Sequence, residues 1–147
     1  MSQTTLLYSD LTEKIIKAFY HVYNSMGYGF LERVYENALV LTLNKWGIKA
    51  QPQLPIEVYF EGTLVGVYYA DIVVNDCVMI ELKAAETIHD AHEAQLLNYL
   101  KATTIEVGLL LNFGPRPSFR RKVFANTRKQ IAKSNPGDST SANNPTG

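Results

Sequence analysis

Two apolar segments joined by a very short connection constrain the fold of this chain most. Residues 64–74 and 78–83 are rich in Val, Ile, Leu and Tyr, and only the three residues Asn-Asp-Cys separate them. β-Branched and aromatic residues favour strands, and an Asn-Asp pair favours a tight turn. Together with a further apolar run at 54–60, the two segments predict three consecutive strands in an antiparallel meander.

Three charged residues interrupt these apolar strands. Asp71 lies in the first segment, while Glu81 and Lys83 lie two residues apart in the second and therefore project from one face. Burying an unpaired charge costs several kcal/mol, which is comparable to the whole stability of a domain. We therefore interpret the three residues as a functional site. Taken alone, the spacing is a weak pattern, and an ion pair at a sheet edge is the alternative.

The register between the two strands decides whether the acidic residues meet. A two-residue turn at 75–76 would pair Val74 with Cys77 and would turn Asp71 away from Glu81. An odd-length loop, such as residues 75–77, or a β-bulge would bring both to one face. We predict such a loop or bulge.

The remaining elements follow from hydrophobic periodicity. Helices are predicted at 10–25, at about 30–46 and at about 90–101, the first and third with capping-box spacings at Asp10/Glu13 and Asp90/Glu93. Residues 106–113 form an apolar strand typical of a sheet interior, followed by a short strand around 122–124 and a last helix. The order predicts an α/β (α+β) domain over residues 1–133, with a mixed central sheet flanked by helices.

Composition fits one domain with no membrane span. No apolar run in the 147 residues reaches the roughly 20 needed to cross a bilayer, and the N-terminus lacks the pattern of a secretory signal. Cys77, the single cysteine, cannot form an internal disulfide and is more consistent with a small buried side chain than with a reactive thiol. We expect a cytoplasmic protein. Residues 134–147 contain no large apolar side chain, which predicts a disordered tail.

Basic residues gather near the end of a chain whose net charge is zero. Residues 107–147 hold seven of the 14 basic residues but only one of the 14 acidic ones. Such a segment suits contacts with phosphate groups, although a solvated basic surface explains it equally well. The candidate nucleic-acid-binding residues are Arg116, Arg120, Arg121, Lys122, Arg128 and Lys129.

Two neighbouring carboxylates suit a hard divalent cation, Mg²⁺ or Mn²⁺. Such a cation polarises a phosphoryl oxygen and lowers the pKa of a bound water. Lys83 would then orient or deprotonate that water, or stabilise charge on the phosphate. His89 and His92 lie close to the predicted site, but a capping or surface position is the more common fate of such histidines.

The charged pattern resembles the PD-(D/E)XK nuclease superfamily. Ala70-Asp71 stands where that superfamily has Pro-Asp, and Glu81-Leu82-Lys83 stands for its ExK half. A closer resemblance is to the small bacterial GxxExxY family, whose signature is matched by GFLERVY at 29–35. The segments YADIVV, IELKA, HEAQLLNYLKAT and VGLLLNFG follow in the order of that family, so the resemblance spans roughly residues 10–125.

The resemblance implies a restriction-endonuclease-like αβββαβ core and a role for each motif residue. Asp71 and Glu81 would bind the metal, with the Leu82 carbonyl as an optional extra ligand, and Glu32 would be an additional acidic residue. Gln95 and Tyr99 match the Q-x3-Y spacing of RecB-like nucleases and share one helix face. Tyr35, one turn after Glu32, either orients that acid or packs in the core.

These observations predict a metal-dependent nuclease of DNA or RNA, with DNA favoured. The alternative is a non-catalytic module that retains the nuclease fold and binds nucleic acid or protein. A homodimer is left open, because no dimer surface is evident in the sequence.

Overall fold

The computed structural model describes residues 8–129, so the predicted tail lies outside the described residues. Its elements, in chain order, are α1 (Ser9–Met26), α2 (Glu32–Lys45), β1 (Ala50–Phe60), β2 (Thr63–Val74), β3 (Val78–Lys83), α3 (Asp90–Lys101), β4 (Val107–Asn112), β5 (Ser118–Val123) and a 3-10 helix (Asn126–Arg128). The order agrees with the prediction through β4.

The five strands form one mixed sheet in the order β1-β2-β3-β4-β5. The first three strands pair antiparallel, which confirms the predicted meander. β3 and β4 are parallel, and α3 makes the crossover that a parallel pair requires. β4 pairs antiparallel with β5, so it lies inside the sheet, and all six of its residues are buried. The sheet and its helices have the restriction-endonuclease-like α+β architecture that the sequence predicted.

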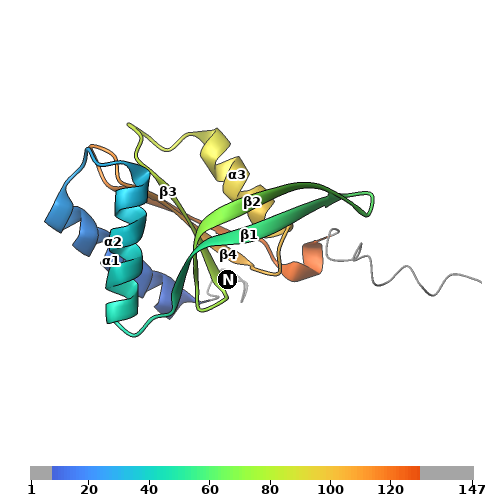
Figure 1. The fold of residues 1–147 in the computed structure, drawn as a ribbon, viewed down its shortest axis with the longest axis horizontal. Coiled ribbons are helices and arrows are strands. Elements are labelled where there is room, and N and C mark those ends of the chain that lie inside the picture. The colour runs from blue at the N-terminus through green and yellow to red at the C-terminus, as the bar shows by residue number, and fades with distance from the viewer. Residues whose placement is uncertain (1–7, 130–147) are drawn as a thin grey trace, which may run out of the picture.

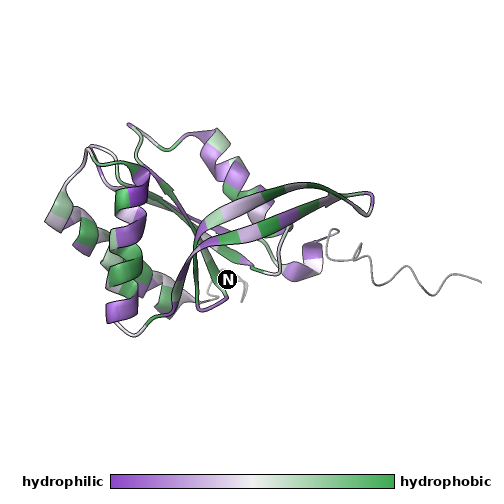
Figure 2. Ribbon diagram, viewed as in Figure 1, coloured by the Kyte–Doolittle hydropathy of each residue, from purple (hydrophilic) through white to green (hydrophobic). Residues whose placement is uncertain are grey.

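Helices cover both faces of the sheet (Figure 1). α1 and α2 pack on the face that carries Ile72, Ile80 and Leu109, while α3 packs on the face of Val73 and Met79. The apolar central strands run between these layers in Figure 2. Of the three α-helices in residues 8–129, none is long and apolar enough to cross a membrane.

The close packing of α3 on β4 depends on a glycine. A Cβ atom built on Gly108 would lie 2.8 Å from Leu96 Cδ1, which is closer than carbon atoms approach without displacement. The missing side chain therefore lets α3 approach the sheet directly beside β3, on which Glu81 and Lys83 lie.

Both predicted capping boxes are wrong, and two terminal elements differ from the prediction. α1 follows Tyr8, which has φ 55° and no side-chain cap. α3 begins at Asp90, so that His89 occupies the capping position and donates its backbone N–H to His92 Nδ1 at 3.3 Å. β5 begins four residues before the strand predicted around 122–124. After it, the part of the chain that the structure describes contains only a 3-10 turn where a helix was predicted.

Candidate active site

The β2–β3 turn fixes the register on which the site depends. Val74 pairs with Val78 and Ile72 pairs with Ile80, so the loop between the strands has three residues. The predicted odd-length loop is therefore confirmed. Continuing the same register places Asp71 directly opposite Glu81.

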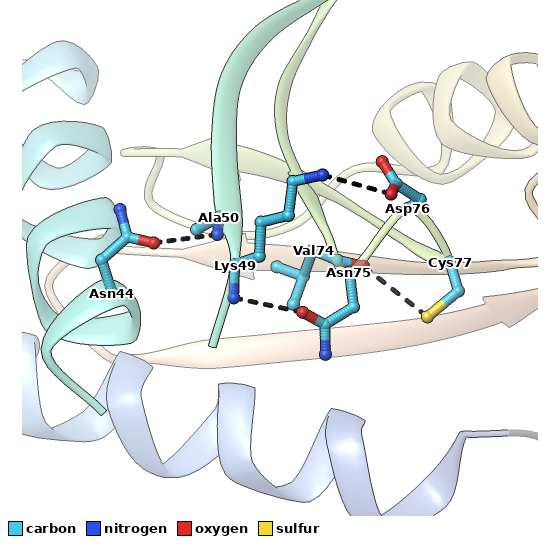
Figure 3. Close-up of polar contacts among 7 residues, drawn as sticks. All are labelled: Asn44, Lys49, Ala50, Val74, Asn75, Asp76 and Cys77. Atoms are coloured by element: carbon cyan, nitrogen blue, oxygen red, sulfur yellow. Dashed lines mark hydrogen bonds and ion pairs between the residues drawn. The ribbon is translucent and has the colours of Figure 1, made fainter. Parts of the chain in front are cut away.

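Hydrogen bonds to the start of β1 hold this turn in place (Figure 3). Asn75 and Asp76 have φ values of 48° and 57°, the left-handed conformation that Asn and Asp tolerate better than most residues. The backbone N–H of Asn75 donates to the Lys49 carbonyl at 2.9 Å, and Asn75 Oδ1 accepts from the Lys49 N–H at 3.1 Å. Lys49 Nζ also pairs with Asp76 Oδ2 at 3.4 Å.

Cys77 completes the turn and is held there. Its backbone N–H donates to the Val74 carbonyl at 3.0 Å, and its thiol lies 3.7 Å from the same oxygen. The thiol packs partly buried against the core, and burial, with the nearby charge of Asp76, raises its pKa. These features fit the predicted structural role better than that of a reactive thiol.

At the other end of the hairpin, two carboxylates replace the regular strand pairing. The paired residues end at Ile72 and Ile80, and beyond them the Asp71 N–H donates to Glu81 Oε1 at 3.2 Å. In return, Asp71 Oδ2 accepts from the Leu82 N–H at 2.8 Å. Each strand thus supplies one carboxylate to the backbone of the other, and the two acidic side chains are held beside each other.

Glu81 is a buried acid in an environment that resists its ionisation. Its exposed fraction is 6%. Burial raises the pKa of Glu81 to about 8, and the neighbouring charge of Asp71 adds to the effect, while Lys83 opposes it. The adjacent carboxyl groups of Asp71 and Glu81 therefore favour the binding of a cation.

A cleft of about 290 Å³ opens at Asp71, between β2, β3 and α2. Its lining residues are Glu32, Arg33, Glu36, Gln53, Asp71 and Leu82. Glu32 and Asp71 therefore lie on the same cleft, as the resemblance implied for the additional acid. The other cleft residues on α2 and β1 were not singled out from the sequence.

Tyr35 holds the loop that precedes Glu32 rather than Glu32 itself. Its hydroxyl donates to the Gly27 carbonyl at 2.7 Å and accepts from the Phe30 N–H at 3.2 Å. The ring is fully buried and stacks on Phe113 with centroids 4.4 Å apart. Of the two expected roles, packing is the one that these contacts support.

On the α3 side, the charges of Lys83 and Glu81 influence the ionisation of neighbouring groups. The charge of Lys83 acts on both Glu81 and His92. The pKa of His92 is lowered, first by burial and then by Lys83 and His89. Tyr99 is buried against Tyr68, and burial together with Glu81 raises its pKa to about 12. The phenol is therefore a hydrogen-bond donor at neutral pH.

Gln95 stands apart from this group. It lies one turn before Tyr99 on α3 but is exposed, and it does not line the Asp71 cleft. His89 and His92 are joined by the capping hydrogen bond at the start of α3, which is the structural role that the sequence favoured for them.

The predicted basic residues lie at the far edge of the sheet, in the β4–β5 connection, on β5 and after it. Arg116, Arg120 and Arg128 are exposed. Lys122 pairs with Glu93 at 2.9 Å, and Arg120 lies 4.0 Å from the same carboxylate. Arg128 lies over the Phe124 ring at 4.9 Å, and burial lowers the pKa of Arg121. Two strands, β4 and β3, separate this edge from β2 and Asp71.

Lys129 is a correction to the sequence prediction. Its exposed fraction is 3%, and its Nζ donates to the carbonyls of Thr103 at 2.8 Å and Ile105 at 2.7 Å. Burial lowers its pKa to about 8. The ammonium group ties the end of the described chain to the α3–β4 connection, so it is unavailable to a phosphate.

The donor atoms at Asp71 and Glu81 fit a hard cation that keeps part of its water shell. Within residues 8–129, no group of three or more His, Cys, Asp or Glu side chains is arranged to hold a metal. Mg²⁺ commonly binds through one or two carboxylates and completes its octahedron with waters and substrate oxygens. Two carboxylates and the Leu82 carbonyl are consistent with that habit.

Glu36 and Gln53 were missed for different reasons. Glu36 is one helical turn after Glu32, so the i, i+4 rule could have placed it on the same face. Gln53 has φ 56° inside β1, a conformation for which glutamine gives no sequence signal.

Comparison with known proteins identifies the family to which this chain belongs. Residues 9–123 match the family model described as the PD-(D/E)XK nuclease superfamily. Among solved structures, the crystal structure of SSO0001 is similar over 86% of this chain, with a TM-score of 0.50 and 18% identity, a level that supports the fold alone. This chain spans 65% of the length of that one. A search of curated proteins found no match.

The matched region includes the whole of the sheet, the α2 cleft and both carboxylate-bearing strands. The chain belongs to the PD-(D/E)XK nuclease superfamily.

Proposed function

We propose that this protein is a Mg²⁺- or Mn²⁺-dependent nuclease that hydrolyses phosphodiester bonds, with Asp71 and Glu81 as the metal ligands. The observation that carries the proposal is the exchange of hydrogen bonds between the two strands, from Asp71 N–H to Glu81 and from Leu82 N–H to Asp71. It holds the two carboxylates beside each other, one of them, Asp71, lining the cleft, in a chain of the nuclease superfamily. The Leu82 carbonyl is the further ligand in this proposal.

When bound at these carboxylates, the cation supplies Lewis-acid polarisation of a phosphoryl oxygen and a more acidic water. Lys83 extends from β3 two residues after Glu81, with its charge acting on that carboxylate. In the proposed mechanism its ammonium group orients the attacking water or stabilises the negative charge that develops on the phosphate.

The remaining motif residues take supporting parts in the proposal. Glu32 adds negative charge to the cleft at the start of α2, where it assists in holding the cation through water. Tyr99, protonated at neutral pH, donates a hydrogen bond towards the Glu81 side of the site. Gln95 is exposed one turn away and contacts substrate at the rim.

The substrate is a nucleic acid, with DNA favoured over RNA. Arg116, Arg120, Arg121, Lys122 and Arg128 supply backbone contacts along the β5 edge, where Glu93 already pairs with two of them. We assign the chain to the GxxExxY branch of the superfamily. The buried Tyr35 of that signature, which braces the loop before Glu32, supports this assignment.

Nuclease assays with plasmid DNA and labelled single-stranded DNA and RNA test the proposal. Purified protein should cleave at least one of them with Mn²⁺ and should lose activity in EDTA. Lys83→Ala should lower the rate by roughly a hundredfold or more, because general acid–base groups contribute about 10²–10⁴. Lys14→Ala, an exposed lysine on α1, is the matched control and should leave the rate unchanged.

Equal rates for Lys83→Ala and the unmodified protein would refute the assignment. Titration calorimetry separates the alternative, a non-catalytic binding module: such a module would bind nucleic acid without binding Mn²⁺ at Asp71 and Glu81. Sedimentation analysis of the same samples reports whether the active species is a homodimer.

A further inference from the structure

The α2 wall of the cleft contains a buried acid that the proposed chemistry does not use. Glu36 has an exposed fraction of 4%, and both of its oxygens are occupied. Oε1 accepts from Gln53 Nε2 at 2.8 Å, and Oε2 lies 3.3 Å from Arg33 Nε. A carboxylate is stable at such a position only when it is paired and hydrogen-bonded, so the three side chains form one unit.

Gln53 reaches Glu36 from an unfavourable backbone conformation. It lies in β1 between Pro52 and Leu54, which pair with Ile72 and Ala70, so it is opposite Asp71. Its φ of 56° is in the left-handed region, which is strained for a residue with a side chain. Strain of this kind persists where the surrounding structure enforces it, and it clusters at functional sites.

Among the side chains of residues 8–129 that line the cleft, Arg33 is the one cation, and three acids accompany it. Such a negative wall would repel a phosphate unless a positive group were fixed within it. The Arg33 side chain is 65% exposed, yet its Nε is held by the buried Glu36. This anchoring leaves the four N–H donors on its two Nη atoms for a ligand.

We propose that Arg33 binds a phosphate group of the nucleic acid beside Asp71, and that Glu36 and Gln53 are positioning residues that hold its guanidinium in the cleft. Arginine suits this task, because its planar fork matches two phosphate oxygens at once. Fixing the fork before binding lowers the ordering cost of each contact. The inference rests on the proposed function only in taking nucleic acid as the ligand.

Binding measured without cleavage tests this inference. The probes are a short fluorescein-labelled DNA duplex and its labelled single strand, titrated by fluorescence anisotropy in Ca²⁺ at several KCl concentrations. Arg33→Ala should weaken binding about tenfold and should reduce the slope of log affinity against log salt by about 0.9 for the duplex, as expected for one lost phosphate contact. Lys17→Ala removes the same charge from an exposed helical ion pair with Glu13 and is the control.

Gln53→Asn separates positioning from folding. Asparagine adopts the left-handed conformation more readily than glutamine, but it is one methylene shorter and should lose the bond to Glu36. We expect a melting temperature close to that of the unmodified protein, because relief of the left-handed strain offsets part of the lost hydrogen bond, with binding weakened about threefold. In ¹⁵N NMR spectra, the Arg33 Nε–H signal should be sharp in the unmodified protein and broadened by exchange in Gln53→Asn, with or without nucleic acid.

The outcomes distinguish this inference from the proposed function. Arg33-dependent binding without Mn²⁺-dependent cleavage would refute the nuclease and support the phosphate contact. Binding by Arg33→Ala with the affinity and salt slope of the unmodified protein would overturn the inference, even if cleavage occurs. An Arg33 Nε–H signal that Gln53→Asn does not change would overturn the positioning role. If the unmodified protein bound neither probe, the phosphate contact itself would be overturned.

Discussion

The two ends of the β2–β3 hairpin differ in which groups pair the two strands. At the turn, backbone groups and polar side chains satisfy one another within the fold: Asn75 and Lys49 exchange two hydrogen bonds, and Val74 and Val78 beside them are fully buried. At the other end, the strands are joined through the carboxylates of Asp71 and Glu81.

One end of the hairpin therefore has a structural role, and the other end carries the candidate site. At the turn end, the polar side chains of Asn75 and Asp76 pair with Lys49. The open end keeps an acid buried with a raised pKa, and opposite Asp71 it keeps Gln53 in a strained conformation. Proteins commonly accept such costs where a site needs them. The turn fixes the register of β2 against β3, and this register brings Asp71 and Glu81 together at the open end.

The largest expected effect comes from separating the two ends. Insertion of one alanine between Ile80 and Glu81 moves every later side chain of β3 to the other face, so that Leu82 leaves the core. The loss should be several kcal/mol, comparable to the total stability of a domain. Circular dichroism should show no cooperative melting transition.

The same insertion between Glu61 and Gly62 is the matched control for this change. That turn lies at the tip of the β1–β2 hairpin, which extends away from the helices in Figure 1, and both residues are exposed. The melting temperature should move by less than about 3 °C, which corresponds to roughly 1 kcal/mol for a domain of this size. A β3 insertion that keeps Mn²⁺-dependent cleavage would show that strand register does not assemble the site.

A smaller effect should appear at the open end when metal is removed. The folded-state pKa of Glu81 is about 8, above its ordinary value of 4.5, so between these values the folded protein binds more protons than the unfolded chain. Linkage then requires that the unfolding free energy in EDTA fall as pH rises from about 4.5 to 8. Glu81→Gln should melt at least about 3 °C higher than the unmodified protein at pH 8 in EDTA.

Added Mn²⁺ completes this experiment. It should raise the melting temperature of the unmodified protein at pH 8, because binding to the folded state stabilises it, and it should leave Glu81→Gln nearly unchanged. A metal-free protein whose stability does not decrease between pH 6 and 8, relative to Glu81→Gln, would contradict the burial argument.

The features of this fold that depend on local sequence pattern could be predicted from the sequence. The strands were predictable because apolar residues alternate or run continuously, and the candidate site was proposed because Asp71, Glu81 and Lys83 break those runs. The odd-length turn followed from the period of a strand alone. The capping boxes failed because α3 begins at Asp90, which makes His89 the residue before the helix.

Contacts between distant segments were beyond that reasoning. The bond between Gln53 and Glu36 joins β1 to α2 through a backbone conformation that the glutamine side chain does not favour. Lys129 was predicted to bind nucleic acid because charged side chains are usually exposed, but here it is buried and its ammonium group binds two backbone carbonyls. Neither contact could be predicted from the sequence, because each depends on which hydrogen-bond acceptors lie close by in the folded structure.

The smallest expected effect comes from the turn end and tests whether its role is purely structural. Asn75→Ala removes the Oδ1 acceptor of the Lys49 N–H and places alanine at φ 48°, so it should cost about 1–2 kcal/mol of unfolding free energy. Asn75→Gly loses the same acceptor without the conformational strain and should therefore cost less. Denaturant titration measures both. Because the turn contributes no group to the cleft, the cleavage rate per folded molecule should be unchanged in both variants, and a lower rate would mean that the two ends are coupled.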